Sequence, residues 1–334
     1  MIKCAIIGAT GLVGRTFLKV LEERKLPIDE YMLFASKNSA GTSIEFNGKK
    51  YTVQELTHDT YKLGFDYALF SAGASTAKEY AKDFSEHGTV VIDNSSCFRQ
   101  DENVPLVVPE VNIETAYNAK LIANPNCSTI QAMVAIFPLH KKYGIKRIVY
   151  STYQAVSGAG QKGIEDYYNS PSNLPMKKFP YQIYNNCIPQ IDNFLENGYT
   201  KEEMKMINET HKILGDNSIG ITATCVRVPV LNCHSESINI ELDELQNISI
   251  DEIKEVLSSQ EGLIIWDHPT SNSYPINTMC TNKDEVMVGR IRKDESVKNG
   301  INLWVVADNV RKGAATNAVQ ILGKIIEFNN INNN

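Results

Sequence analysis

Short apolar runs alternate with helical stretches over the first third of the chain. Residues 4–7, 31–35, 67–71 and 90–93 are runs of strand length, and residues 14–24 and 76–87 carry apolar side chains at helical spacing. Strands that alternate with helices are typical of βαβ units. The pattern therefore predicts an α/β domain built on a mostly parallel sheet with right-handed crossovers.

The pattern changes after about residue 126. A long helix is predicted at 128–143 and a strand at 147–154, followed by an Asn-, Pro- and Tyr-rich segment at 169–198 that we expect to form an extended loop. Thr200 and Glu203 form a T-x-x-E capping box, which predicts a helix that ends near residue 214.

The remaining pattern predicts a second, α+β domain with an antiparallel-looking sheet. Strands are expected at 221–228, 237–242, 285–292 and 302–307, the second of them with Ile238, Ile240 and Leu242 alternating with polar residues. A last helix at 314–328 is expected to pack back on the first domain, and the Asn-rich tail, 329–334, is expected to fray. We therefore expect one domain from residues 1–126 and 309–334 and another from residues 127–308.

Composition and charge narrow the class of protein. With 334 residues, 43% hydrophobic and 22% charged, the chain has the balance of a globular protein of two domains. The net charge of −6 comes without a cationic patch, so no nucleic-acid partner is expected. No membrane-spanning run or signal-peptide pattern is visible, and the seven cysteines include no C-x-x-C pair. These features predict a cytoplasmic protein with free thiols and no metal site.

A glycine turn joins the first predicted strand to the first predicted helix. The run G-A-T-G-L-V-G at residues 8–14 allows close backbone approach, so the helix N-terminus could hold a pyrophosphate. The spacing is a weak signal alone, but its strand–turn–helix context predicts a Rossmann-type dinucleotide site. The alternative is a glycine-rich turn without a ligand.

The end of the second predicted strand bears on the choice of dinucleotide. An acidic residue there would bind ribose hydroxyls and repel a 2′-phosphate. This chain instead has Ser36, Lys37, Asn38 and Ser39, which offer hydroxyls, an amide and a cation. The sequence therefore favours NADP over NAD.

Cys127 is the candidate nucleophile. It stands at the start of the long predicted helix, where the partial positive charge of the helix N-terminus favours a thiolate and the first-turn N–H groups can stabilise an oxyanion. Cys97 is the rival, although no helix clearly begins there, and Cys4 and Cys225 lie in apolar strands as structural cysteines do.

His234 and Arg227 are the candidate partners of the thiol. His234 has the parity of Ile238 and is expected to face inward, where it is either a core residue or an acid–base group. His140 lies thirteen residues after Cys127 on the same predicted helix, roughly 20 Å away, and cannot serve. Arg227 interrupts an apolar strand, so it needs an anion, either a protein carboxylate or a substrate.

Together these motifs resemble the bacterial-type aspartate-semialdehyde dehydrogenase family. The resemblance rests on residues 8–14, N-P-N-C-S-T at 124–129, Q-A-V-S-G-A-G at 154–160 and the pair Arg227 and His234, and it extends from residue 2 to about residue 323. It implies NADPH-dependent reductive dephosphorylation of L-aspartyl 4-phosphate to L-aspartate 4-semialdehyde, on the route to diaminopimelate, lysine, methionine and threonine.

The resemblance also implies residue roles. Cys127 would form a thioester, His234 would act as acid and base, and Gln154 would orient the substrate. The substrate carboxylate, amine and phosphate would be bound by Arg227, Glu209, Arg99, Lys212 and Asn126. Without the resemblance, Glu209 and Lys212 would be a surface ion pair and Arg99 a solvated loop cation.

For the cofactor, the resemblance implies one set of residues along the chain. They are Gly8, Thr10, Gly11, Leu12, Val13, Ser36, Lys37, Asn38, Ser39, Thr76, Ser157, Gly158 and Asn309. Relatives often carry an arginine at the position of Asn38, so the NADP preference would rest on Lys37, a point charge without a bidentate fork. Residues 1–126 and 309–334 would bind NADP, and residues 127–308 would carry catalysis and assembly into a homodimer or homotetramer.

The sequence leaves three alternative functions open. N-acetyl-γ-glutamyl-phosphate reductase resembles the same fold and chemistry, but typically has glycine at the position of Asn126 and needs no carboxylate such as Glu209. A thiol hydrolase or acyltransferase using Cys127 and His234 leaves the glycine turn unexplained. A non-catalytic NADP-binding protein leaves Arg227 and His234 without a role.

Overall fold

The computed structural model describes residues 1–172, 174–243 and 249–332. It divides into two compact units. Unit 1 consists of Met1–Pro125 with Ala314–Asn334, and unit 2 consists of Asn126–Gly313.

Unit 1 is built on a six-stranded sheet whose strand pairs are all parallel. The strand order is β5-β2-β1-β6-β7-β8, so the order reverses at β1, where neighbours on both sides come later in the chain. The mostly parallel sheet predicted for the first domain is confirmed. The strands are β1 (Lys3–Ile7), β2 (Glu30–Ala35), β5 (Gln54–Glu55), β6 (Tyr67–Phe70), β7 (Val90–Asp93) and β8 (Leu121–Ala123).

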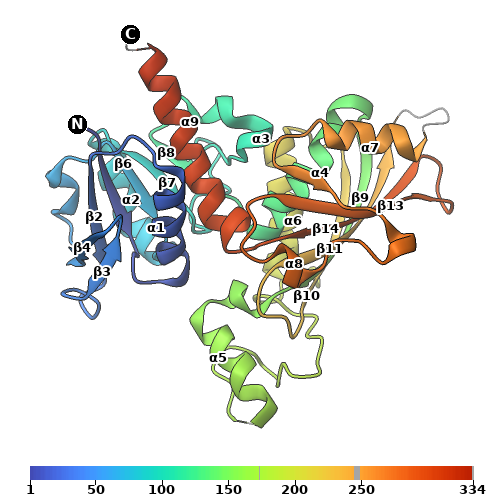
Figure 1. Ribbon diagram of the computed structural model, residues 1–334, viewed down its shortest axis with the longest axis horizontal. Coiled ribbons are helices and arrows are strands. Elements are labelled where there is room, and N and C mark those ends of the chain that lie inside the picture. The colour runs from blue at the N-terminus through green and yellow to red at the C-terminus, as the bar shows by residue number, and fades with distance from the viewer. Residues whose placement is uncertain (173, 244–248, 333–334) are drawn as a thin grey trace. The chain divides into compact units, whose positions relative to one another are not determined.

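Helices complete unit 1. They are α1 (Leu12–Arg24), α2 (Ala74–Glu86), the short α3 (Pro109–Asn112) and α9 (Asn317–Asn332). α1 buries Phe17, Leu18 and Leu21 because these side chains recur at helical spacing. α9 returns from the end of the chain to pack against α1 and β7, as predicted for the last helix (Figure 1).

The predicted fraying from residue 329 is wrong for the residues that the structure describes, because α9 continues through Asn332. Its last turns are held to unit 1 by two contacts. The ring of Phe328 stacks on Tyr117 with centroids 4.1 Å apart, and the Asn329 amide donates to the Tyr67 hydroxyl at 3.2 Å.

A β-hairpin in unit 1 is absent from the sequence-based expectations. β3 (Ser43–Phe46) and β4 (Lys49–Thr52) pair antiparallel around Asn47-Gly48, where both residues have positive φ, 51° and 69°. Asn-Gly between short alternating runs is a recognised hairpin signal, so this element was readable from the sequence. The short 3₁₀ segments η1 (Thr60–Leu63) and η2 (Ile113–Ala116) carry no comparable signal.

Unit 2 is built on a mixed sheet of order β10-β9-β11-β14-β13-β12. The expected antiparallel arrangement is confirmed for its central pairs and wrong for β9–β10 and β12–β13, which are parallel. β9 and β10 run parallel because α6 (Lys201–Leu214) forms a crossover between them. The strands are β9 (Ile145–Gln154), β10 (Gly220–Arg227), β11 (His234–Leu242), β12 (Leu263–Ile265), β13 (Val286–Asp294) and β14 (Gly300–Ala307).

Three helices pack on this sheet. α4 (Cys127–Tyr143) contacts β9, β11, β13 and β14, and it is flanked by α6 over β10 and by α7 (Ile250–Ser258) over β12 and β13. The predicted capping box that begins α6 is confirmed, with Thr200 and Glu203 each bonded to the other's backbone. The one-turn helix α8 (Asn277–Cys280) and the 3₁₀ segment η5 (Pro269–Ser271) complete the connections.

The segment between β9 and α6 leaves the sheet (Figure 1). It contains η3 (Val156–Ala159), α5 (Gln161–Asn169) and η4 (Ser170–Ser172), and it has no helix or strand over 174–198, in agreement with the predicted extended loop. Buried Asp166 fixes its return, because its carboxylate accepts the N–H groups of Lys177, Lys178 and Phe179 at 2.7–3.0 Å. Over the described ranges, we find no helix that combines the length and the apolarity needed to cross a membrane.

Candidate active site

Cys127 is the first residue of α4, as the sequence predicts. Asn126 is the N-cap, and its side-chain oxygen accepts the N–H groups of Ser128 and Thr129 at 2.9 and 3.3 Å. This cap is local, because the Asn side chain reaches donors two and three residues ahead. It places the half-buried Cys127 at the positive end of a 17-residue helix, an environment that favours a thiolate.

His234 faces this sulfur from the first position of β11. Its Nε2 atom lies 3.2 Å from Cys127 Sγ, and only 1% of the residue is exposed, so the predicted inward orientation is confirmed. The Nδ1 atom accepts the Ala155 N–H at 3.0 Å. Because Nδ1 is an acceptor, the proton of the neutral ring resides on Nε2, on the side of the thiol.

Burial, and then the positive charge of Arg227, lower the pKa of His234 from 6.5 to about 3. The imidazole is therefore neutral at physiological pH. A neutral ring with its proton on Nε2 is a hydrogen-bond donor to sulfur, and it can stabilise negative charge on Cys127 without becoming an imidazolium.

The residue before His234 is held in a rare backbone conformation. Cys233 has φ 69°, its N–H donates to Asn309 Oδ1 at 3.0 Å, and its carbonyl accepts from the Asn277 amide at 2.7 Å. Asn309 also hydrogen-bonds the Ser157 hydroxyl at 3.0–3.2 Å. Two residues expected near the nicotinamide thus belong to the network that sets the start of β11.

Arg227 ends β10 and is buried beside the imidazole. Its Nη1 donates to the Ala155 carbonyl, and its guanidinium lies 5.9 Å from the Phe179 ring centroid. No ion pair of Arg227 is found among the described residues, and burial lowers the pKa of its guanidinium below the usual value. Of the two anions considered from the sequence, the protein carboxylate is not found at ion-pair distance among the described residues.

Gly158 lies against both of these side chains. A Cβ atom there would stand 3.1 Å from Arg227 Nη1 and 3.1 Å from His234 Cε1, closer than ordinary van der Waals contact. The glycine therefore keeps space open beside the thiol and its partners.

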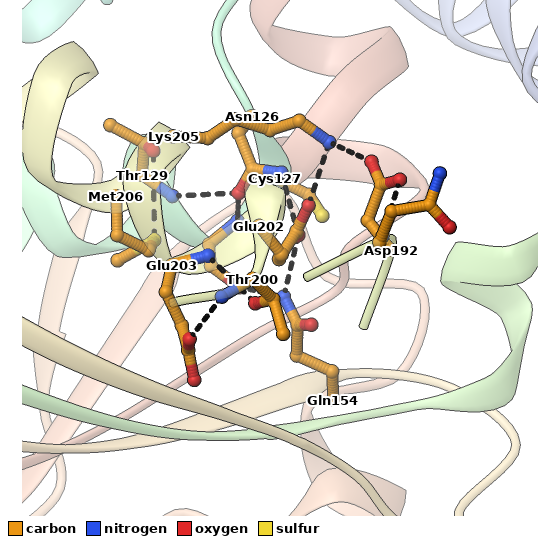
Figure 2. A network of polar contacts seen from close by, with 12 residues as sticks. Asn126, Cys127, Thr129, Gln154, Asp192, Thr200, Glu202, Glu203, Lys205 and Met206 are labelled. Carbon is orange, nitrogen blue, oxygen red and sulfur yellow. Dashed lines mark hydrogen bonds and ion pairs between the residues drawn. The ribbon is translucent and has the colours of Figure 1, made fainter. Parts of the chain in front are cut away.

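Glu202, Lys205 and Asp192 form a charged network next to Cys127 that the sequence did not predict. Figure 2 shows the Glu202 carboxylate accepting from the Asn126 amide at 2.8 Å and from the Gln154 amide at 3.1 Å. Its other oxygen pairs with Lys205 at 2.9 Å, and Lys205 also pairs with Asp192 at 3.1 Å. Burial alone would raise the pKa of Glu202, but Lys205 and the amide donors outweigh it and lower that pKa to about 2.

Glu209 and Lys212, the pair implied by the resemblance, lie two turns further along α6. Glu209 is fully buried, and its carboxylate accepts the Asn126 N–H at 2.6 Å, so the surface ion pair considered from the sequence is wrong for it. Glu202 and Lys205 have the same i, i+3 spacing seven residues earlier, on the same helix face. This shared spacing is the sequence feature from which Glu202 and Lys205 could have been predicted.

Arg99 and Cys97 belong to unit 1. Arg99 is only 8% exposed and donates to the carbonyls of Asn124 at 2.9 Å and Asn94 at 3.0 Å, so it is not a solvated loop cation. Burial and nearby Asp93 raise the pKa of Cys97, which disfavours the reactive thiolate at this rival position. Cys4 and Cys225 are buried with raised pKa values, as expected for structural thiols.

The glycine turn of unit 1 fits a dinucleotide. Gly8 has φ 84°, and a Cβ there would collide with the Ser71 backbone, while a Cβ on Gly14 would collide with the Gly8 backbone. Gly11 is the N-cap of α1 and has no side chain that could satisfy the first-turn N–H groups of this helix. The turn also follows β1, where the strand order reverses, which is where open parallel sheets bind such ligands.

The residues after β2 form an exposed turn. The Ser39 N–H donates to the Ser36 carbonyl at 2.9 Å, and Ser36, Lys37 and Asn38 are exposed. Thr76 lies in the first turn of α2, after Gly73 with φ 87°. The two segments follow β2 and β6, the strands that flank β1 in the sheet.

Comparison with known proteins gives consistent matches over nearly the whole chain. Residues 3–119 match the family model "Semialdehyde dehydrogenase, NAD binding domain", and residues 136–312 match "Semialdehyde dehydrogenase, dimerisation domain". The aspartate-semialdehyde dehydrogenase of Aquifex aeolicus is 55% identical over 335 aligned residues, covering 97% of this chain and 98% of the relative.

Solved structures agree with these matches. Aspartate semialdehyde dehydrogenase II of Vibrio cholerae, complexed with ASA, superposes with a TM-score of 0.92 at 46% identity and 98% coverage of both chains. The Candida albicans enzyme with NADP superposes with a TM-score of 0.79 at 25% identity, covering 99% of this chain and 100% of that one.

Proposed function

The chain belongs to the aspartate-semialdehyde dehydrogenase family, and from that premise we propose which role each residue has in the reaction. The reaction is the reductive dephosphorylation of L-aspartyl 4-phosphate to L-aspartate 4-semialdehyde, an oxidoreductase step of amino-acid biosynthesis. The alternative activity on N-acetyl-γ-glutamyl phosphate is not favoured, because the relatives from Aquifex aeolicus and Bacillus subtilis, which match 97% of this chain, are both aspartate-semialdehyde dehydrogenases.

In this proposal Cys127 is the nucleophile. Its thiolate attacks the acyl carbon of the substrate, the carbon–oxygen bond to phosphate breaks, and a thioester remains on the sulfur. The observation that carries the assignment is the 3.2 Å contact between Cys127 Sγ and His234 Nε2 at a capped helix N-terminus. Both the helix terminus and the Nε2–H group stabilise negative charge on the sulfur.

When bound, NADPH would supply the hydride that converts the thioester to a tetrahedral oxyanion. His234 holds its proton at Nε2, facing the sulfur, because Nδ1 is occupied by the Ala155 N–H. When this oxyanion collapses, the carbon–oxygen double bond forms again, the carbon–sulfur bond breaks, the aldehyde leaves and the electron pair returns to Cys127. The imidazole thus stabilises the same thiolate at the beginning and at the end of the cycle.

Arg227 is proposed to bind the substrate carboxylate, since it is a buried cation without an ion-pair partner among the described residues. Gln154, which donates to Glu202 and Ser128, is proposed to orient the substrate. Arg99 remains a proposed phosphate-binding cation.

Two carboxylate–lysine pairs on α6 are candidates for binding the amine and the phosphate of the substrate. We favour Glu202 and Lys205 over Glu209 and Lys212, because Glu202 contacts the side chains of Asn126 and Gln154. The Lys205 side chain is 25% exposed and so is accessible to an anion. Glu209, in contrast, is fully buried and uses its carboxylate to hold the Asn126 backbone.

NADP is the proposed cofactor, held by the turn at residues 8–14 and by the groups after β2. Ser157, Gly158 and Asn309 remain proposed cofactor-binding residues, as the resemblance implies. The absence of an acidic side chain at residues 36–39 supports NADP over NAD. A solved relative described with NADP supports the same choice.

We further propose a cytoplasmic homodimer or homotetramer. Residues 136–312 match a dimerisation domain, and Tyr153 on β9 is 39% exposed beside the ring of Trp304, as expected of a partner-covered surface. None of the seven cysteines forms a disulfide, which suits a reducing compartment. We propose that residues 1–126 and 309–334 bind the cofactor and that residues 127–308 carry the catalytic residues.

The test is the reverse reaction, followed as NADPH formation from L-aspartate 4-semialdehyde. We expect turnover that requires phosphate, that is lost in Cys127→Ser and that persists in Cys97→Ser, because only Cys127 can form the acyl thioester. Retained turnover in Cys127→Ser would overturn the nucleophile assignment. Preference for N-acetylglutamate semialdehyde would overturn the substrate.

A further inference from the structure

The segment between β9 and α6 returns to the sheet of unit 2 at Arg227. Ile188 forms an antiparallel bridge with Arg227, in which the N–H group of each residue donates to the carbonyl of the other at 2.9 Å. Ile183 and Ile188 are buried in a cluster with Val156, and Phe179 packs against this cluster. The segment therefore fixes the backbone of Arg227 and also brings an aromatic ring close to it.

The Phe179 ring lies against the charged end of Arg227. The guanidinium carbon is placed over the ring, 5.9 Å from the ring centroid, a distance at which the negative face of an aromatic ring attracts a cation. The side chain of Arg227 is thus held at two points, by this ring and by the Ala155 carbonyl that accepts from Nη1. A ring carries no net charge, so it stabilises the guanidinium without neutralising it, as a carboxylate would.

Asp166 fixes the position of Phe179. Asp166 lies on α5, is fully buried, and accepts three backbone N–H groups with its carboxylate. The donors are Lys177 and Lys178 at 2.7 Å and Phe179 at 3.0 Å. Gly163, on the same helix, leaves room for the ring, because a Cβ atom there would stand only 3.3 Å from Phe179 Cζ. The backbone of Phe179 and the place of its ring are therefore both determined by α5.

We propose that Phe179, fixed by Asp166, is a positioning residue that holds the Arg227 guanidinium ready to bind the carboxylate of the substrate. The inference rests on the proposed role of Arg227. An arginine side chain loses rotamer freedom when it binds an anion, and this loss weakens binding. Contact with the ring removes that freedom before the substrate arrives.

The first test compares the KM values of the three reactants in the direction that forms NADPH. We expect Phe179→Leu to raise the KM for L-aspartate 4-semialdehyde by about threefold to tenfold, the cost of immobilising one arginine side chain. The values of kcat and of the KM for phosphate and for NADP should stay within about twofold, because the contact serves ground state and transition state alike. Phe179→Tyr keeps the ring and should retain the original KM.

Tyr181→Ala is the matched control, because it removes a ring that is 69% exposed from the same segment. An original KM for L-aspartate 4-semialdehyde in Phe179→Leu would overturn the proposal. So would an equal rise in Phe179→Tyr, or an equal rise of all three KM values in Phe179→Leu, since either result indicates general disturbance of the segment. Leucine and tyrosine both keep the apolar cluster filled, so the comparison does not depend on a variant with a cavity.

A double variant tests whether Asp166 acts through Phe179. Asp166→Asn keeps the size of the side chain but replaces one accepting oxygen by a donor, so it loses at least one of the three backbone contacts. We expect it to raise the KM for L-aspartate 4-semialdehyde, with no further rise when it is combined with Phe179→Leu. Independent effects of the two substitutions on this KM would show that Asp166 does not act through the ring.

Arg227→Lys separates this inference from the proposed function. It is expected to raise the KM for L-aspartate 4-semialdehyde, because a lysine lacks the fork that binds a carboxylate at two points. If that KM rises in Arg227→Lys but not in Phe179→Leu, the role of Arg227 stands and the inference about Phe179 is wrong. An unchanged KM in Arg227→Lys would refute the carboxylate-binding role and with it the inference.

Discussion

Cys127 Sγ and His234 Nε2 lie 3.2 Å apart although 107 residues separate them in the chain. The sulfur is placed by the start of α4, and the imidazole is placed by the start of β11. The Ala155 N–H on Nδ1 then fixes which ring nitrogen carries the proton. This arrangement makes the histidine a proton donor to the thiolate, and its consequences are open to direct measurement.

Two matched variants distinguish the carboxylate–lysine pairs of α6. We expect Glu202→Gln to raise the KM for L-aspartate 4-semialdehyde by about tenfold or more, because a charge-assisted contact with the substrate amine is worth about 1.5–3 kcal/mol. Glu209→Gln is expected to act mainly on stability, since that carboxylate holds the buried Asn126 N–H.

Steady-state kinetics and urea unfolding of both variants provide the measurement. The reverse outcome, with a large KM effect only in Glu209→Gln, would return the amine-binding role to Glu209.

The lowered pKa of His234 predicts a loss of stability in acid. Burial and the nearby Arg227 lower this pKa from 6.5 to about 3, while Glu202 opposes them. Between these values the unfolded chain binds a proton that folded His234 does not, so its contribution is full above about pH 6.5 and falls toward pH 3. Glu202, with a pKa lowered to about 2, adds a loss of the same sign below about pH 4.5.

The check is the change in urea midpoint between about pH 7 and about pH 5, compared between variants because buried Glu236, whose pKa is raised, contributes a pH dependence of opposite sign in each of them. His234→Asn should lose less of its midpoint on acidification than the original protein. His268→Asn, at an exposed position of unit 2, should retain most of the original slope. Identical slopes in the original protein and His234→Asn would contradict the lowered pKa.

Cys233 is predicted to tolerate glycine and to reject branched side chains. Its φ of 69° costs a non-glycine residue about 1–2 kcal/mol, and a β-branched residue more. In Cys233→Gly, relief of this strain offsets the lost packing of the buried thiol, so stability and activity should stay near the original values. Cys233→Val should lose about 1–3 kcal/mol of unfolding free energy and also kcat, because the start of β11 shifts.

Urea unfolding together with the 3.2 Å thiol–imidazole geometry in a crystal structure of each variant would test this. A Cys233→Val protein as stable and active as the original would show that the conformation is not under strain.

The cofactor preference is predicted to depend on the turn after β2. Lys37→Ala should raise the KM for NADP more than the KM for NAD, because only NADP carries a 2′-phosphate. Asn38→Arg should lower the KM for NADP, since a guanidinium offers the bidentate contact that a lysine cannot. Equal effects on both cofactors in Lys37→Ala would remove this residue from the cofactor site.

The features that the sequence determined by itself are those formed within a few residues. The Asn126 cap reaches only to Ser128 and Thr129, and the capping box of Thr200 and Glu203 closes within three residues. The alternation in β11 likewise fixed the inward face of His234. Each depends on local backbone geometry, which is the same wherever the element is placed.

Tertiary structure decided how these elements meet. Glu202 and Glu209 lie on one face of α6 with the same spacing to a lysine, and only packing against Asn126 and Gln154 distinguishes them. The tautomer of His234 depends on an N–H group 79 positions away. Contacts between distant residues depend on strand register and helix packing, which no short stretch of sequence encodes.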